Sequence, residues 1–144
     1  MDIDYYSPRG LNCLCGNLRM AARAVTRVYD EHLRPAGMQA SQLAVLWAVA
    51  GMPQATVKDI AAQIAMDETA LLRNLRVLEG REWVSLEVGD DRRQRLVHLT
   101  AAGQRAFAKA LPLWKTAQDA VDAVLEGSIK EMNRKLLQLA RAVG

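Results

Sequence analysis

Apolar residues recur every three or four positions along most of this chain, which is the period of one face of an α-helix. Between residues 10 and 33 this apolar face is formed by Leu11, Leu14, Leu18, Ala21, Val25 and Val28. Pro35 and Gly37 are expected to end the first helix, because proline and glycine interrupt helical patterns. The segment 41–49 is almost wholly apolar and predicts a second helix that is buried, Trp47 included.

The middle of the chain predicts two short helices followed by a hairpin. A very short strand at 55–57 is expected to lead into a helix at 57–64. Asp67 has the chemistry of an N-cap for the next helix, which extends to about Arg81, since its carboxylate can accept amide hydrogens of the first turn. The core face of that helix is predicted to be Leu71, Leu75 and Leu78, and its outer face Thr69, Leu72, Arg73 and Arg76.

Two strands and two further helices complete the pattern. Residues 83–88 alternate between apolar and polar, residues 96–99 return, and Gly89-Asp90-Asp91 is typical turn chemistry. Thr100 is predicted to cap a long helix, and Ser128 a last one. The first and last helices carry more apolar surface than a small domain needs, which favours pairing with a second chain. The expected fold is mainly α with a small β-hairpin.

Composition narrows the class of protein. A chain of 144 residues predicts one domain, and one Phe, three Trp and three Tyr leave a core built mostly from Ala, Leu and Val. A formal charge of +3 and a pI of about 9.1 hint weakly at a polyanionic partner. We see no signal peptide or membrane-spanning run, so we expect a cytoplasmic protein without a membrane partner. Cys13 and Cys15 are too few for a disulfide framework.

The helix that follows Asp67 and the hairpin tip together predict a DNA-reading device. B-DNA's major groove admits one α-helix, where arginine can bind guanine and an apolar side chain can meet a thymine methyl. An arginine at a hairpin tip is attracted by the negative potential of a narrow minor groove. The predicted DNA-binding residues are Glu68, Thr69, Leu72, Arg73, Arg76, Arg92, Arg93 and Arg95. An amphipathic helix with arginines is usually only a solvated face, and 73–95 holds six arginines against five acids. The prediction of DNA binding therefore rests on the order of the elements, which is helix, turn, capped helix, hairpin and basic tip.

Two stretches, DIAAQIAMDETALLRNLRVLEGREWV and GDDRRQRLVHLTAAGQ, resemble the winged helix-turn-helix of MarR-type transcriptional regulators. The resemblance covers nearly the whole chain (1–144). It implies a homodimer that represses transcription from a pseudo-palindromic double-stranded operator, with 39–100 as the DNA-binding part and 10–34 and 101–143 as dimerisation helices. It also implies that Asp91 pairs with Arg93 and that Arg93 enters the minor groove. The chain departs from the pattern at Glu82, where the family usually has glycine.

The sequence leaves two effectors open. Cys15, near the start of the first helix, with Tyr29 resembles the organic-hydroperoxide sensors of the family, because thiolates near helix N-termini oxidise readily. Ala40 stands where a second tyrosine is expected, and Cys15 can equally pack as a small hydrophobe. The other hypothesis is a small aromatic or acidic ligand in an apolar pocket, with arginine meeting a carboxylate. The predicted pocket residues are Met20, Arg19, Arg23, Trp47, Met52 and Trp114.

Nothing in the sequence predicts an enzyme. It has no glycine-rich phosphate loop, no metal-ligand spacing and no nucleophile beside a histidine, so no cofactor or metal is expected. His32 and His98 are isolated and are interpreted as a helix C-terminal charge and an exposed strand residue. A purely helical dimer that does not bind DNA is the remaining alternative from a different class.

Overall fold

The computed structural model describes residues 12–144, which contain six α-helices, one 3₁₀ helix and two strands. The elements are α1 (Leu14–Leu33), η2 (Arg34–Ala36), α2 (Ala40–Gly51), α3 (Val57–Gln63), α4 (Glu68–Gly80), β1 (Val84–Val88), β2 (Arg95–Leu99), α5 (Ala101–Val124) and α6 (Ile129–Val143). The prediction of a mainly helical fold with one small hairpin is confirmed. In the described residues, no helix is both long and apolar enough to cross a bilayer.

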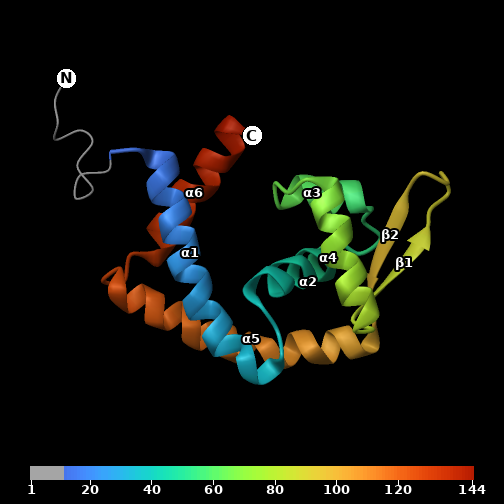
Figure 1. The fold of residues 1–144 in the computed structure, drawn as a ribbon, viewed down its shortest axis with the longest axis horizontal. Coiled ribbons are helices and arrows are strands. Elements are labelled where there is room, and N and C mark those ends of the chain that lie inside the picture. The colour runs from blue at the N-terminus through green and yellow to red at the C-terminus, as the bar shows by residue number, and fades with distance from the viewer. Residues whose placement is uncertain (1–11) are drawn as a thin grey trace.

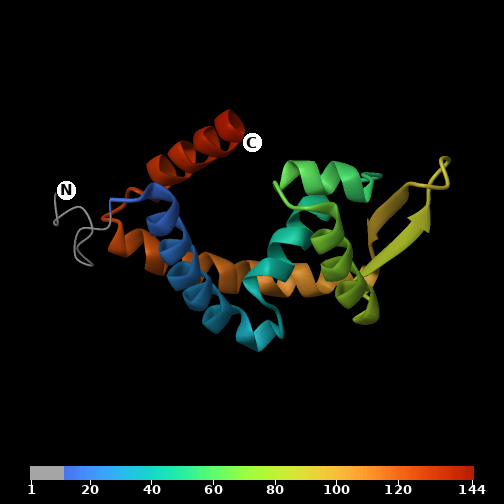
Figure 2. The same cartoon turned by 45° about the horizontal axis from the view of Figure 1, so that its top comes forward.

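The molecule has two parts, which α5 connects (Figure 1). One part contains α1, α6 and the C-terminal half of α5, and we call it the frame. The other contains α2, α3, α4 and the hairpin, and we call it the reading head. The same separation is visible in the second view, where α6 and the hairpin lie at opposite ends of the molecule (Figure 2). The two parts differ in how their apolar faces are covered.

The reading head has a closed core. Its fully buried side chains come from α2, α3, α4 and both strands, and include Leu46, Ile60, Leu71, Leu75, Leu78, Val84 and Val97. The predicted core face of α4 is therefore confirmed. Asp67 caps α4 as predicted, because its Oδ2 accepts the backbone N–H of Ala70 at 3.1 Å. The cap and the leucine face together orient α4 with its outer side to solvent.

The hairpin is antiparallel, with Val84 opposite Leu99 and Val88 opposite Arg95. The strand predicted at 55–57 is reduced to a single bridge between Thr56 and Leu96, because Val57 already begins α3. Glu82 has φ +61, so this position does need the left-handed backbone that glycine adopts most easily. A glutamate at position 82 therefore costs folding free energy relative to glycine. Helix α4 ends at Gly80.

Two further expectations, on Ser128 and Trp47, are wrong, and a third lies partly outside the described residues. Gly10 and Leu11, which the apolar pattern places in the first helix, lie outside residues 12–144, and α1 begins at Leu14. Ser128 does not cap α6 with its side chain, because its hydroxyl donates to the Leu125 carbonyl and Asp122 Oδ1 accepts the first α6 amide hydrogen instead. Trp47 is 42% exposed rather than buried, because its face of α2 points into an open cavity.

Much of the apolar surface of the frame stays exposed within residues 12–144. No residue of α6 is buried, and Leu33 is the one buried residue of α1 within its described length. Met132 and Leu136 are 42% and 39% exposed on the same side of α6. Met20 and Val25 of α1 are 55% and 39% exposed.

Candidate nucleic-acid interface

The start of α3 is held by a reciprocal capping box. Thr56 Oγ1 accepts the backbone N–H of Asp59 at 3.1 Å, and Asp59 Oδ2 accepts the backbone N–H of Thr56 at 3.0 Å. The backbone N–H of Thr56, followed by its hydroxyl, lowers the pKa of Asp59 below its ordinary value of 3.8. The Asp59 carboxylate is therefore engaged in the cap. The side chain of the preceding residue, Lys58, is exposed.

The N-terminal half of α4 carries the outward-facing side chains. Glu68, Thr69 and Arg73 are exposed, whereas Leu72 is half-buried because part of it packs on the core. Arg76 is exposed and forms an ion pair with Glu79 at 3.0 Å. The carboxylate of Glu68, the hydroxyl of Thr69 and the guanidinium of Arg73 thus lie along one side of α4. The half-buried side chain of Leu72 lies between them.

A groove of about 630 Å³ runs between the starts of α3 and α4 and the hairpin tip. It is lined by Thr56, Val57, Lys58, Asp59, Glu68, Thr69, Leu72, Asp91, Arg93, Gln94 and Arg95. Three segments separated in the chain therefore contribute to one surface, which carries three basic side chains (Lys58, Arg93 and Arg95) and three acidic ones (Asp59, Glu68 and Asp91).

The groove brings together most of the residues predicted for DNA binding. It is lined by Glu68, Thr69, Leu72, Arg93 and Arg95. Asp91 of the hairpin tip, which we call the wing, lines it as well. The remaining predicted residues, Arg73, Arg76 and Arg92, are exposed outside its lining.

The sequence prediction missed the contribution of α3. Thr56, Lys58 and Asp59 line the groove, as does Gln94 of the wing. The T-x-x-D spacing from Thr56 to Asp59 was the available signal, since it marks a helix start whose first residues face outward.

The hairpin tip is organised by side-chain to backbone hydrogen bonds. Asp91 Oδ1 accepts the backbone N–H of Arg93 at 3.0 Å. The guanidinium of Arg95 donates to the carbonyls of Arg92 at 2.9 Å and Gln94 at 3.3 Å. The predicted pairing of the Asp91 and Arg93 side chains is not present: no ion pair within residues 12–144 involves either one. The short two-residue separation lets the carboxylate reach the nearer backbone amide, which leaves the Arg93 guanidinium directed to the groove.

A second cavity, of about 450 Å³, lies where α1, α2, α3 and α5 meet. Trp47 packs edge-on against Trp114, with ring centroids 4.9 Å apart, and against Phe107 at 5.6 Å. The Tyr29 hydroxyl donates to Gln118 Oε1, and burial raises the pKa of Tyr29 above its ordinary value of 10.0. The lining is Tyr29, Ala40, Leu43, Ala44, Trp47, Ala48, Gln63, Ile64 and Trp114, with no charged side chain.

The cavity includes only part of the predicted pocket. Trp47 and Trp114 line it, whereas Met20, Met52 and both arginines, Arg19 and Arg23, do not. Arg19 lies ten residues before Tyr29 on α1, which places it about 15 Å further along the helix axis. The prediction went wrong because the helical period gives the face of a residue but not its height against the neighbouring helices.

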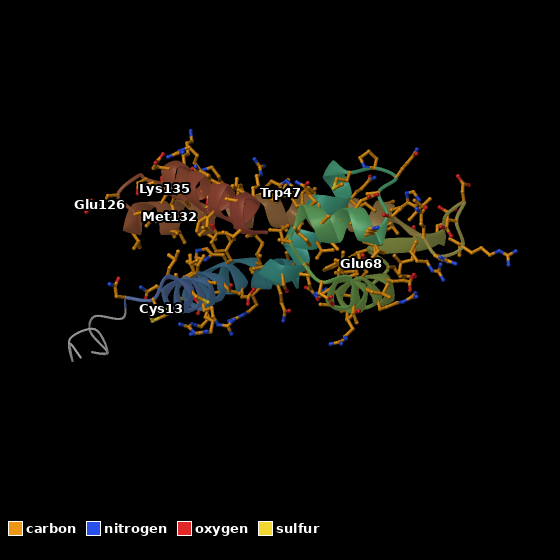
Figure 3. The ribbon with its side chains drawn as sticks, turned by 90° about the horizontal axis from the view of Figure 1, so that it is seen from above. Cys13, Trp47, Glu68, Glu126, Met132 and Lys135 are labelled. Carbon is orange, nitrogen blue, oxygen red and sulfur yellow. The ribbon has the colours of Figure 1, made fainter. Side chains whose placement is uncertain are left out.

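Cys15 is exposed in the first turn of α1, after Cys13, whose Sγ accepts the backbone N–H of Gly16 at 3.4 Å. Tyr29 is fourteen residues later, about 21 Å along the axis, so one chain does not bring it to Cys15. Figure 3 places Cys13 at one end of the molecule and Glu68 of the reading head towards the other. Among residues 12–144 no group of three or more His, Cys, Asp or Glu side chains is placed to hold a metal ion.

The arrangement of α3, α4 and hairpin has close counterparts among known proteins. Residues 36–94 match the model described as "MarR family". The fold superposes on the Mycobacterium tuberculosis transcriptional regulator MosR in complex with DNA, with a TM-score of 0.80 and 34% identity over 91% of this chain and 98% of that one. The chain belongs to the MarR family.

Two further proteins extend the comparison. The uncharacterized HTH-type transcriptional regulator YwoH of Bacillus subtilis is 28% identical over 94 residues, which are 65% of this chain and 69% of that one. MarR of Escherichia coli shares the fold, with a TM-score of 0.68 and 22% identity over 92% of this chain and 98% of that one. The protein is therefore a DNA-binding transcriptional regulator of the MarR family and not an enzyme.

Proposed function

We propose that this MarR-family regulator is a homodimeric repressor that holds two reading heads on a pseudo-palindromic operator and is released by a small ligand. The observation that carries the proposal is the groove in which the starts of α3 and α4 meet the wing tip. Two copies of such a surface, held at a fixed distance, match the two half-sites of a palindrome.

Within the groove, each segment would have a separate task. Thr69, Leu72 and Arg73 of α4 would read base edges in the major groove, by hydrogen bonding, contact with a thymine methyl and a fork onto guanine respectively. Arg93 at the wing would enter the minor groove, since its guanidinium takes part in no ion pair within residues 12–144. Arg76, Arg92, Arg95 and Lys58 would contact phosphates, which give affinity without sequence preference.

The dimer would form through the frame. On the apolar side of α6, Met132 and Leu136 are exposed and Ile129 and Leu139 are half-buried within residues 12–144, and α1 exposes Met20 and Val25. Burying such faces against a second copy gains roughly 25 cal/mol per Å² of apolar surface. The segments 101–143 and 10–34 are thus proposed as the dimerisation region, and 39–100 as the DNA-binding part.

The effector would bind in the cavity beside Trp47 and Trp114. Its volume of about 450 Å³ is in the range of small-molecule sites. The two indole rings, inclined at 69° to each other, offer aromatic contacts to a flat ring, and the Tyr29 oxygen can still accept a hydrogen bond while it donates to Gln118. Of the two ligand classes predicted, the lining favours an aromatic one, because it holds no cation for an acid.

A second candidate effector is an organic hydroperoxide acting on Cys15, which is favoured by the exposure of this thiol at the end of the frame. The thiolate sulfur would attack the hydroxyl-bearing oxygen of the peroxide and break the O–O bond, giving a sulfenic acid and an alkoxide that takes a proton from water to form the alcohol. Cys15→Ser should then abolish release by the peroxide while leaving release by aromatic compounds intact. If the unmodified protein remains on DNA in peroxide, this candidate fails.

The test of the main proposal is binding to the DNA immediately upstream of the protein's own gene, titrated with aromatic compounds and peroxides. Arg73→Ala and Arg93→Ala should each weaken operator binding by roughly 1–3 kcal/mol with the dimer intact, as judged by sedimentation. Lys109 is an exposed residue of α5, so Lys109→Ala is the control that removes one positive charge elsewhere. Unchanged operator affinity in both arginine variants would refute the reading assignment.

A further inference from the structure

Arg81 directly follows α4 and reaches across to a segment 44 residues earlier in the chain. One guanidinium nitrogen donates to the Gly37 carbonyl at 2.6 Å. The guanidinium carbon lies 3.6 Å from the centre of the Trp83 ring. A Cβ on Gly37 would lie 3.2 Å from the other terminal nitrogen, so the fit leaves little free space. We call this set of contacts the Arg81 clasp.

The segment held by the clasp is fixed to the frame. Gly37 ends η2, which packs against both α1 and α5. Three residues later, the backbone N–H of Ala40 donates to Asp30 Oδ1 of α1 at 2.7 Å. Gly37 therefore lies in the junction between α1 of the frame and α2, and the clasp ties the end of α4 to that junction.

The residues that follow Arg81 are attached to the start of α5. The Thr100 hydroxyl, at the start of α5, donates to the Glu82 carbonyl at 2.5 Å, and the Thr100 backbone N–H donates to the Trp83 carbonyl at 3.1 Å. Gly103 permits this approach, because a Cβ there would stand 1.9 Å from the Trp83 oxygen. The C-terminal end of α4 is thus held from α5 and from the end of α1.

We propose that Arg81 is a positioning residue for DNA binding, which sets the angle of α4 on the frame through the clasp. The inference rests on the proposed reading role of α4. The helix has 13 residues, so its reading end lies about 20 Å from Arg81, and a tilt of about 5° would displace that end by nearly 2 Å. Such a displacement exceeds the tolerance of a hydrogen bond to a base edge. Arg81 does not line the groove, and its guanidinium is already engaged.

The test compares Arg81→Met with the unmodified protein for operator affinity across a series of salt concentrations. We expect affinity to fall about tenfold, roughly the loss of one well-formed base contact of α4. The slope of log affinity against log salt should stay unchanged, because no phosphate contact is removed. A slope reduced by about one would overturn the proposal, since it marks a direct phosphate contact. An unchanged affinity would also overturn it.

Three further variants keep the outcome decisive. Arg81→Lys retains the charge and a donor, so it should lose less affinity than Arg81→Met at an unchanged melting temperature. If Arg81→Met fails to fold, Arg81→Lys is compared alone, and affinity equal to that of the unmodified protein overturns the proposal. Arg105→Met removes the same charge from the exposed surface of α5 and should change little. Arg73→Ala separates the two proposals. If Arg73→Ala binds the operator normally, as well as Arg81→Met, the proposed reading role of α4 has failed rather than the clasp.

Discussion

The reading head and the frame are both helical and amphipathic, yet they differ in what completes them. Leu46, Ile60 and Leu75 of the reading head are fully buried inside one chain. In the frame, α6 has a strong apolar side and no buried residue. The reading surface is thus complete within one chain, whereas in the proposed dimer the distance between two such surfaces would depend on contacts with a second chain. The predictions below test this division, beginning with the largest expected effect.

Leu75→Ala should lower the free energy of unfolding by about 2–5 kcal/mol, because it leaves a cavity in a closed core. Leu136→Ala, the same change on α6, should instead make the melting temperature more dependent on protein concentration, since its partner would be another chain. Urea unfolding and thermal melts at two protein concentrations measure both. Equal, concentration-independent losses in the two variants would contradict the division.

Leu136→Asp places a charge in the uncovered side of α6 and should dissociate the dimer. Operator affinity should then fall by about 10²-fold or more, because the second reading head no longer binds at a high effective concentration. Gln138→Asp adds the same charge on another side of α6 and is the control. Sedimentation and binding to whole and half operators check this, and an intact Leu136→Asp dimer would exclude α6 from the interface.

Lys58→Ala should weaken binding several-fold to every DNA sequence and reduce the salt slope by about one, as expected for a single phosphate contact. The measurement is affinity for operator and for unrelated duplex at several salt concentrations. A loss restricted to the operator would mean that Lys58 reads bases and that α3 shares the task of α4.

Glu82→Gly should raise the free energy of unfolding by up to about 1 kcal/mol, because glycine avoids the cost of φ +61 at this position. The entropy lost by glycine on folding offsets part of the gain. Chemical denaturation measures the change, with Glu126→Gly, at φ 53 in the frame, as the matched variant. A destabilised Glu82→Gly protein would show that the Glu82 side chain has a role of its own.

The smallest expected effect concerns the α3 cap. The pKa of Asp59 is lowered in the folded state, so its contribution to stability is present above its ordinary value of 3.8 and is lost as the pH falls through the lowered value. Asp59→Asn should therefore make the free energy of unfolding depend slightly less on pH in acid solution. Near neutral pH, the curves of the variant and the unmodified protein should run nearly parallel. Denaturation between pH 2 and pH 7, with Asp119→Asn on the exposed side of α5 as control, measures the difference.

Local signals predicted the reading head well, for reasons visible in particular residues. The Asp67 cap and the leucines of α4 specify a helix with one buried side, and alternation in 84–88 specifies a strand. The wing tip was placed correctly, although Asp91 holds the backbone of Arg93 rather than its side chain. That choice depends on an atomic distance in the turn, which residue spacing does not reveal.

By itself the sequence determined the helices, the hairpin and the outward side of α4, because each follows from hydrogen bonds and apolar periods within a few residues. Tertiary structure alone decided that Lys58 joins the groove, that Trp47 faces a cavity while Arg19 lies far from it, and that Arg81 reaches Gly37. These outcomes depend on the height and angle at which whole helices pack against one another. Packing of that kind sums weak contacts over distant segments, so no single stretch of the chain records it.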